Sequence, residues 1–239
     1  MLINNIQYQY FTLNKIKMKE ELLSKLSECT ELGKINLASP FPPQLKGQNG
    51  VDELTREALD SGISPEEVLE ALVSGMGVIG DKFSAGKAFV PNMLMAAKAM
   101  SAGMAHLKPF FNSGQVKRKG TFVIGTVFGD LHDIGKNLVA MTVEGAGWEV
   151  IDLGVDVKPE KFVEVIAQYP DCVVGLSALL TTTMNNMEVV LKAIKEKFPE
   201  KIVIIGGAPL SQEFSDKIGA TGYSSSPQGA VNLLNQLVA

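Results

Sequence analysis

Four short apolar runs fill the second half of the chain, and each is separated from the next by enough amphipathic sequence for a helix. The runs lie at residues 121–127, 148–154, 171–177 and 201–207, and a shorter run near residue 221 is a candidate fifth. They are rich in Val and Ile and apolar throughout rather than alternating, which is typical of strands buried on both faces. The pattern predicts an α/β fold in which helices cover both faces of a doubly wound parallel sheet of about five strands.

The first half of the chain carries helix signals and almost no strand signals. Amphipathic segments begin near residue 20, at residue 52, at Pro65 and at Pro91. Ser64 stands at an N-cap position with Glu67 three residues later, which is the capping-box pattern. Residues 39–50 are rich in Pro and Gly, a composition that neither a helix nor a central strand tolerates. These signals predict a small four-helix bundle.

The two patterns predict two domains, a helical domain over residues 18–115 and an α/β domain over residues 119–239. The length of 239 residues fits this division, since domains commonly span roughly 100 to 150 residues. Residues 1–17 are polar and without clear periodicity, so we expect a leader or a loose arm there, with Met18 as a candidate natural start.

Composition excludes several classes of function. The chain has 22 Lys and Arg against 26 Asp and Glu, and no basic block that could neutralise a run of phosphates, so nucleic acid is not an expected partner. It has no apolar stretch of about 18 residues and no signal-peptide core. Cys29 and Cys172 stand too far apart to indicate a disulfide framework or a zinc cluster. We therefore expect a cytoplasmic protein that does not span a membrane.

The loop after the first predicted strand combines glycines with charged residues, at the sheet edge where parallel sheets bind ligands. Five residues separate Gly129 from Gly135, and Asn137 follows Lys136, so the spacing of a phosphate-binding loop is not met. A dinucleotide fingerprint of the G-x-G-x-x-G type is also absent. The loop therefore favours a ligand other than a nucleotide.

His132 in this loop has two interpretations. It is either a metal ligand, with Asp130 accepting a hydrogen bond from its other ring nitrogen, or a histidine that only caps or packs. Its place at the expected ligand edge favours the first. His106, in the Met-rich and Ala-rich helix, has no partner nearby in the sequence and is interpreted as structural.

Hydroxyl groups and glycines follow the next predicted strands. Ser177 and Thr181–Thr183 come after the third strand, where their hydroxyls could bind a ligand or the Asp130 carboxylate. Alternatively, Thr182 or Thr183 only caps the following helix. Gly206 and Gly207 come after the fourth strand and allow close approach of a ligand, although such a pair is also a common turn.

Three of these elements together resemble the signature of cobalamin-binding domains in order and spacing. They are Asp130-x-His132-x-x-Gly135, Ser177-x-Leu179 and Gly206-Gly207. Residues 80–100 resemble the helical cap of corrinoid proteins that serve anaerobic methyltransferase systems. The resemblance covers residues 20 to 239 and implies a four-helix cap followed by a Rossmann-like (flavodoxin-like) cobalamin-binding domain.

The resemblance also implies roles for the matched residues. His132 would be the lower axial ligand of cobalt in a cobalamin or related corrinoid. Asp130 and Thr183 would complete a relay with it, and at the position of Thr183 related methionine synthases carry Ser. Ser177 and Thr181 would contact the buried cofactor tail. The other implied cofactor contacts are Gly129, Asp133, Ile134, Gly135, Leu179, Gly206 and Gly207. Met93, Met95 and Met100 would shield the upper face of the corrin, unless they are only bundle core.

The function implied by the resemblance is that of a methyl carrier. Such a protein accepts a methyl group on Co(I) from a substrate:corrinoid methyltransferase and delivers it from methyl-Co(III) to a second methyltransferase acting on tetrahydrofolate or a thiol. A reductive activase would be a third partner. A methyltransferase barrel takes roughly 250 residues, so we expect a subunit that is not catalytic alone.

The methyl donor is left open by the resemblance. Residues 39–50 resemble the branch that demethylates methoxylated aromatics (O-demethylases), while methylamine, methanol and betaine systems stay open. Three functions compete with the methyl carrier: a cobalamin-responsive regulator, the small subunit of an adenosylcobalamin mutase, and a flavodoxin-like domain without corrinoid.

Overall fold

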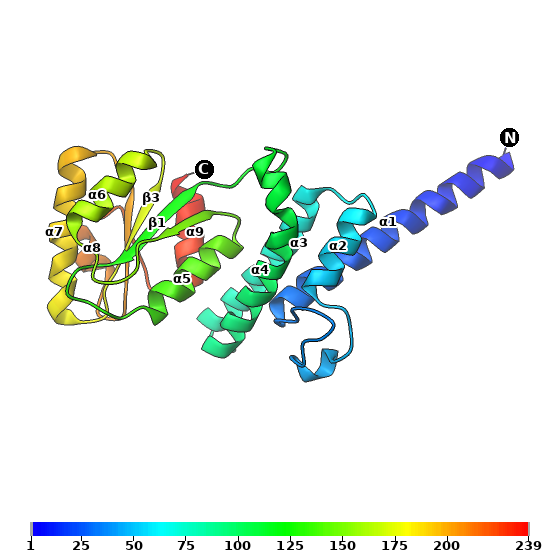
Figure 1. Cartoon of the computed structure of the whole chain (residues 1–239), viewed down its shortest axis with the longest axis horizontal. Helices are drawn as coiled ribbons and strands as arrows, with labels where there is room; N and C mark the ends of the chain where they lie inside the picture. Colours follow the sequence, from blue (N-terminus) through cyan, green and yellow to red (C-terminus); the bar gives the residue numbers. More distant parts are fainter. Residues whose placement is uncertain (1, 239) are drawn as a thin grey trace. The chain divides into compact units, whose positions relative to one another are not determined.

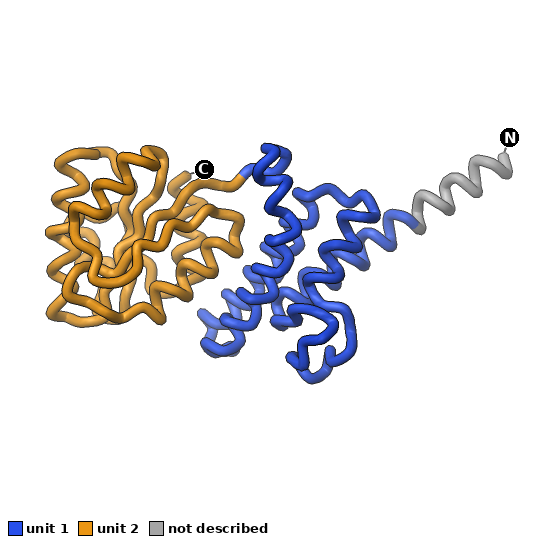
Figure 2. Tube along the Cα trace, in the orientation of Figure 1, with its two compact units in different colours: residues 1–117 blue, residues 118–239 orange. Residues whose placement is uncertain are grey.

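The computed structural model describes the backbone of residues 2–238 and the side chains of residues 15–238. The chain divides into two compact units, residues 1–117 and residues 118–239 (Figure 2). The predicted leader or loose arm over residues 1–17 falls almost wholly outside the described side chains and stays a prediction. Within the described part of the chain, none of the helices combines the length and the hydropathy that crossing a bilayer requires.

The first unit is a bundle of helices. It contains α1 (Leu2–Glu31), α2 (Val51–Asp60), α3 (Pro65–Ser84) and α4 (Val90–Asn112), with a short 3-10 turn, η1 (Pro43–Leu45), between α1 and α2. Its core is formed by buried apolar side chains from all four helices, among them Leu26, Leu54, Leu72, Met76, Met93 and Leu107. The helical cap predicted from the sequence is thus confirmed as a fold.

The predicted capping box starts α3. Ser64 Oγ accepts a hydrogen bond from Glu67 N at 3.3 Å, and Ser64 N donates to Glu67 Oε2 at 3.4 Å. Pro65 occupies the first helical turn, where its missing N–H costs no hydrogen bond. The start of α3 is therefore fixed by its local sequence.

The second unit is a parallel sheet of five strands in the order β2-β1-β3-β4-β5. The strands are β1 (Thr121–Thr126), β2 (Glu149–Asp152), β3 (Val173–Ser177), β4 (Val203–Gly206) and β5 (Gly222–Ser224). The first four each lie within a predicted run, and the fifth lies at the short run near residue 221. The predicted α/β fold class is confirmed.

Helices cover both faces of this sheet (Figure 1). One face packs against α5 (Ile134–Gly145) and α9 (Pro227–Leu237), and the other against α6 (Pro159–Gln168), α7 (Thr181–Lys197) and α8 (Gln212–Ile218). In β1, Phe122 and Ile124 belong to the first core and Val123 to the second. Because both sets are buried, the strand sequences show no alternation of apolar and polar residues.

The strand order reverses between β1 and β3, which makes the carboxyl ends of these two strands the switch point of the sheet. The register pairs Thr126 with Ser177, Ser177 with Gly206, and Gly206 with Ser224. The loops that follow β1, β3 and β4 therefore start side by side along one edge.

We expect Ser64→Ala to lower the free energy of unfolding by about 1 kcal/mol, because it leaves the Glu67 N–H at the start of α3 without its cap. Chemical denaturation followed by circular dichroism measures this change. The matched control is Ser61→Ala, since Ser61 is exposed at the end of α2. Equal stability of the two variants would contradict the prediction.

Candidate functional site

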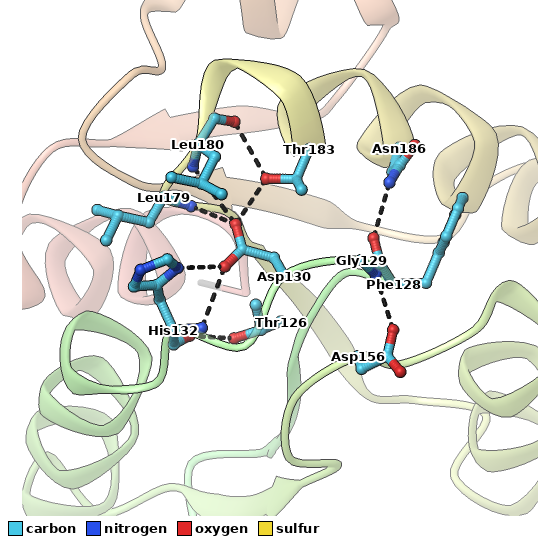
Figure 3. A network of polar contacts seen from close by, with 10 residues as sticks. All are labelled: Thr126, Phe128, Gly129, Asp130, His132, Asp156, Leu179, Leu180, Thr183 and Asn186. Atoms are coloured by element: carbon cyan, nitrogen blue, oxygen red, sulfur yellow. Dashed lines mark hydrogen bonds and ion pairs between the residues drawn. The ribbon is translucent and has the colours of Figure 1, made fainter.

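The centre of the ligand edge is the buried carboxylate of Asp130, in the loop between β1 and α5 (Figure 3). Its Oδ1 lies 2.7 Å from His132 Nδ1 and accepts a hydrogen bond from His132 N at 3.1 Å. Its Oδ2 accepts from Thr183 Oγ1 at 2.6 Å and from Leu179 N at 2.8 Å. The carboxylate thus joins the loop after β1 to the start of α7.

These hydrogen bonds decide the charge of Asp130. Burial by itself would raise the pKa of the carboxyl, but hydrogen bonds from Thr183, Leu179 and His132 outweigh it and hold that pKa well below its usual range. An ionised carboxylate only accepts hydrogen bonds, so the Nδ1 atom of His132 is the donor in this contact. In the neutral imidazole, the lone pair then lies on Nε2.

The Nε2 atom of His132 is open to a ligand. The side chain is 49% exposed, and no residue in the described part of the chain forms a hydrogen bond with Nε2. The backbone is fixed at the same residue, because Thr126 Oγ1 donates to His132 O at 2.9 Å. The arrangement offers one oriented nitrogen donor to a metal that is brought by a cofactor.

Large apolar side chains are exposed in the same two loops. Leu131 is 72% exposed and Ile134 68% exposed on either side of His132, and Leu179 and Leu180 are also exposed beside the Asp130 carboxylate. Exposed apolar groups of this size around a polar donor indicate a surface that a ligand covers. The residues present therefore fit a large, mostly apolar cofactor that carries a metal.

Thr183 is placed at Asp130 and not at the helix cap. The N-cap residue of α7 is Leu180, and Thr183 Oγ1 contacts both the Asp130 carboxylate and Leu180 O. Thr181 and Thr182 are exposed in the first turn of the same helix. Of the three threonines, the structure brings only Thr183 to the His132 pair.

Gly207 is required by close packing at the end of β4. Its φ of 147° lies where side chains are rare, and a Cβ there would overlap the carbonyl oxygen of Ala178. Ala178 N also donates to Gly206 O at 3.3 Å. Gly206, Gly207 and the partly buried Ser177 thus lie together, and their role as the slot for a cofactor tail stays a prediction.

The remaining loop residues differ in their exposure. Asp133 and Gly135 are exposed, and Asp133 accepts a hydrogen bond from Asn137 Nδ2 at 3.1 Å. Lys136 is buried, and its ammonium pairs with the carboxylate of Asp152 at the end of β2. The lysine is therefore not presented to a ligand, which argues against the phosphate-loop interpretation.

The methionines of α4 lie in the bundle. Met93 is 1% exposed and Met100 is 3% exposed, while Met95 packs beside Gly33. Phe89 and Leu94 are exposed apolar side chains at the start of α4. Which of these residues cover the corrin stays a prediction.

Two residues that sequence patterns did not single out hold the Asp130 loop. Asp156 Oδ1 accepts a hydrogen bond from Gly129 N, and Asn186 Nδ2 donates to Phe128 O, each at 2.7 Å (Figure 3). The spacing of Asn186, three residues after Thr183 on one helix, is the signal that could have found it. No comparable signal marks Asp156.

We expect Asp130→Asn to destabilise the chain at pH 7 by about 1 to 3 kcal/mol, because the amide cannot accept all of these hydrogen bonds. The depressed pKa of Asp130 means that its ionised form stabilises the fold fully above about pH 4, and that this contribution is lost as the pH falls further. Denaturation at a series of pH values should show the gap between the two proteins narrowing below pH 4. A gap independent of pH would contradict the prediction.

Comparisons with known proteins agree with this geometry. Residues 120–231 match the B12 binding domain family, and residues 48–108 match a second family with the same description. The chain is 38% identical over 218 residues to the trimethylamine corrinoid protein of Methanosarcina barkeri, covering 89% of this chain and 94% of that protein. It is 37% identical over 225 residues to the dimethylamine corrinoid protein of the same organism, covering 92% and 99%.

Solved structures give the same result. The methanol:cobalamin methyltransferase complex MtaBC from Methanosarcina barkeri aligns with a TM-score of 0.75 and 29% identity, covering 91% of this chain and 80% of that chain. A cobalamin-binding protein from Desulfitobacterium hafniense DCB-2 aligns with a TM-score of 0.68 and 30% identity, covering 79% and 91%. With its His132 site and these relatives, the chain belongs to the corrinoid proteins of methyltransferase systems, whose cofactor is a corrinoid.

Proposed function

We propose that this chain is a methyl carrier in which Nε2 of His132 would be the nitrogen ligand that the protein supplies to the corrinoid cobalt. The observation that carries the proposal is the oriented pair of Asp130 and His132, with Nδ1 held by a buried carboxylate and Nε2 left open. The family supports the carrier over the regulator and mutase alternatives, because the relatives described above are named for methylated amines and for a methyltransferase complex.

When bound, the corrinoid supplies a cobalt atom that takes up a methyl group and gives it away again. The Asp130 carboxylate fixes the imidazole plane of His132 and makes Nε2 a stronger donor, since a histidine ligand gains basicity when its other nitrogen donates to a carboxylate. The hydrogen bond from Thr183 helps to keep Asp130 ionised.

The other residues of the edge bind and orient the cofactor in this proposal. Leu131, Ile134, Leu179 and Leu180 would hold the corrin and exclude water from the imidazole. Gly129, Asp133 and Gly135 would let the loop backbone approach the ring. Ser177, Thr181, Gly206 and Gly207 would hold the cofactor tail, since they lie at or next to the neighbouring ends of β3 and β4.

We propose a methylated amine as the methyl donor. The support is the similarity to the trimethylamine and dimethylamine corrinoid proteins along most of the chain. O-demethylation of a methoxylated aromatic rests only on the composition of residues 39–50.

The partners would be a substrate:corrinoid methyltransferase, a corrinoid methyltransferase acting on tetrahydrofolate or a thiol, and a reductive activase. The methanol complex supports the first of these.

The buried, free thiols of Cys29 and Cys172 agree with a reducing cytoplasm, the compartment proposed for this chain.

The first test is reconstitution with hydroxocobalamin under anaerobic conditions, followed by desalting and an absorption spectrum. We expect about one corrinoid per chain, with an altered spectrum and weaker retention for His132→Ala, since the axial nitrogen is lost. His106→Ala is the matched control, because His106 pairs with Asp52 in the helical unit at 2.6 Å and is not part of the site. A His132→Ala spectrum identical to that of the wild type would remove His132 from the coordination sphere.

The donor is tested by mixing the reduced, reconstituted protein with methyltransferases for trimethylamine, methanol and a methoxylated aromatic, each with its own substrate. We expect demethylation of the amine to be fastest, and the demethylated product is measured by chromatography. Turnover only with the methoxylated aromatic would show instead that residues 39–50 had indicated the correct branch.

A further inference from the structure

The loop that carries Asp130 is held at consecutive residues by side chains from two other elements. Asn186, on α7, donates Nδ2 to Phe128 O at 2.7 Å. Asp156, in the loop between β2 and α6, accepts from Gly129 N through Oδ1 at 2.7 Å. Neither side chain touches His132, so any influence on the imidazole passes through the backbone of residues 128–130 and the Asp130 carboxylate (Figure 3).

Asp156 binds the backbone at both Gly129 and Asp130. Its carboxylate takes the N–H of Gly129, and its own N–H donates to Asp130 O at 3.0 Å. Asp156 has a φ of 54°, a left-handed conformation that residues other than glycine rarely adopt and that Asp and Asn tolerate best. The side chain is exposed, so packing in the core does not account for this conformation. The two hydrogen bonds to the loop account for it instead.

Asn186 acts together with Thr183, three residues earlier on the same face of α7. Two side chains of this helix therefore donate hydrogen bonds to the loop, one to Phe128 O and one to the Asp130 carboxylate, with Gly129 between them. Gly129 has a φ of 81°, and a Cβ there would lie 3.3 Å from Asn186 Nδ2. The backbone of these three residues is thus fixed from two directions, which sets where the Asp130 carboxylate can lie.

We infer that Asp156 and Asn186 are positioning residues for His132. They hold the peptide that aims Asp130, and Asp130 in turn orients the imidazole. The inference rests on the proposed role of His132 as the cobalt ligand. Outer partners of a metal-bound histidine are commonly worth a factor of about 10 to 100 in affinity. Asp156 and Asn186 are one further hydrogen bond away from the histidine than such partners are. We therefore expect an effect at the lower end of that range, about 10-fold.

The test compares Asn186→Ala and Asp156→Gly with the matched control Asn185→Ala. Glycine at residue 156 keeps the left-handed backbone and its N–H donor and removes only the carboxylate. Asn185 is the exposed neighbour of Asn186 on α7. For each protein, the dissociation constant of hydroxocobalamin, the absorption spectrum of the reconstituted protein and the thermal unfolding midpoint without corrinoid are measured. We expect about 10-fold weaker binding in the two test variants, and spectra shifted toward that of His132→Ala, while Asn185→Ala matches the wild type.

The spectrum separates positioning from a purely structural role. Weaker binding with an unchanged spectrum, or no change in either, would overturn the inference and leave the proposed function intact, provided that His132→Ala alters the spectrum. If His132→Ala leaves the spectrum unchanged, the proposed function itself fails. Should Asn186→Ala fail to fold, the near-isosteric Asn186→Asp removes the donor with little change in volume. The dissociation constant and the absorption spectrum of that variant then decide.

Discussion

The candidate site depends on one buried carboxylate, that of Asp130, which accepts hydrogen bonds from two separate loops. A parallel sheet brings the loops after β1 and β3 to the same edge, but it does not make them adhere to each other. Asp130 does so, because it takes the Leu179 N–H and the Thr183 hydroxyl from one loop and the His132 ring from its own. A buried charge is tolerated only when its hydrogen bonds are satisfied, so folding and site geometry share the same contacts.

The same carboxylate explains why the imidazole faces outward. His132 lies between an internal acceptor, which occupies Nδ1, and a surface of exposed apolar side chains such as Leu131 and Ile134. Neither ring nitrogen has an alternative partner among the described residues, so the ring is not drawn into other contacts. The protein thereby keeps one ring nitrogen available to a ligand.

The fold and part of the site could be predicted because their signals are local. Continuous apolar runs such as residues 121–127 identify buried strands, and the pairing of Ser64 with Glu67 marks the start of a helix. The contact of Asp156 could not be predicted, because it joins residues 27 positions apart and depends on a left-handed backbone. The contact of Asn186 joins residues 58 positions apart, and only its spacing from Thr183 marks it. Burial was equally hidden at Lys136, whose ammonium pairs with the carboxylate of Asp152.

The ion pair of Lys136 and Asp152 has a consequence for how this surface can diverge. It ties the beginning of α5 to the end of β2, while Thr126 secures the loop at His132. Leu131 and Ile134, on either side of His132, are exposed and take part in neither of these contacts. Substitutions at those two positions would change the surface offered to the cofactor with little cost in stability, because the contacts that hold the loop around the histidine do not involve them.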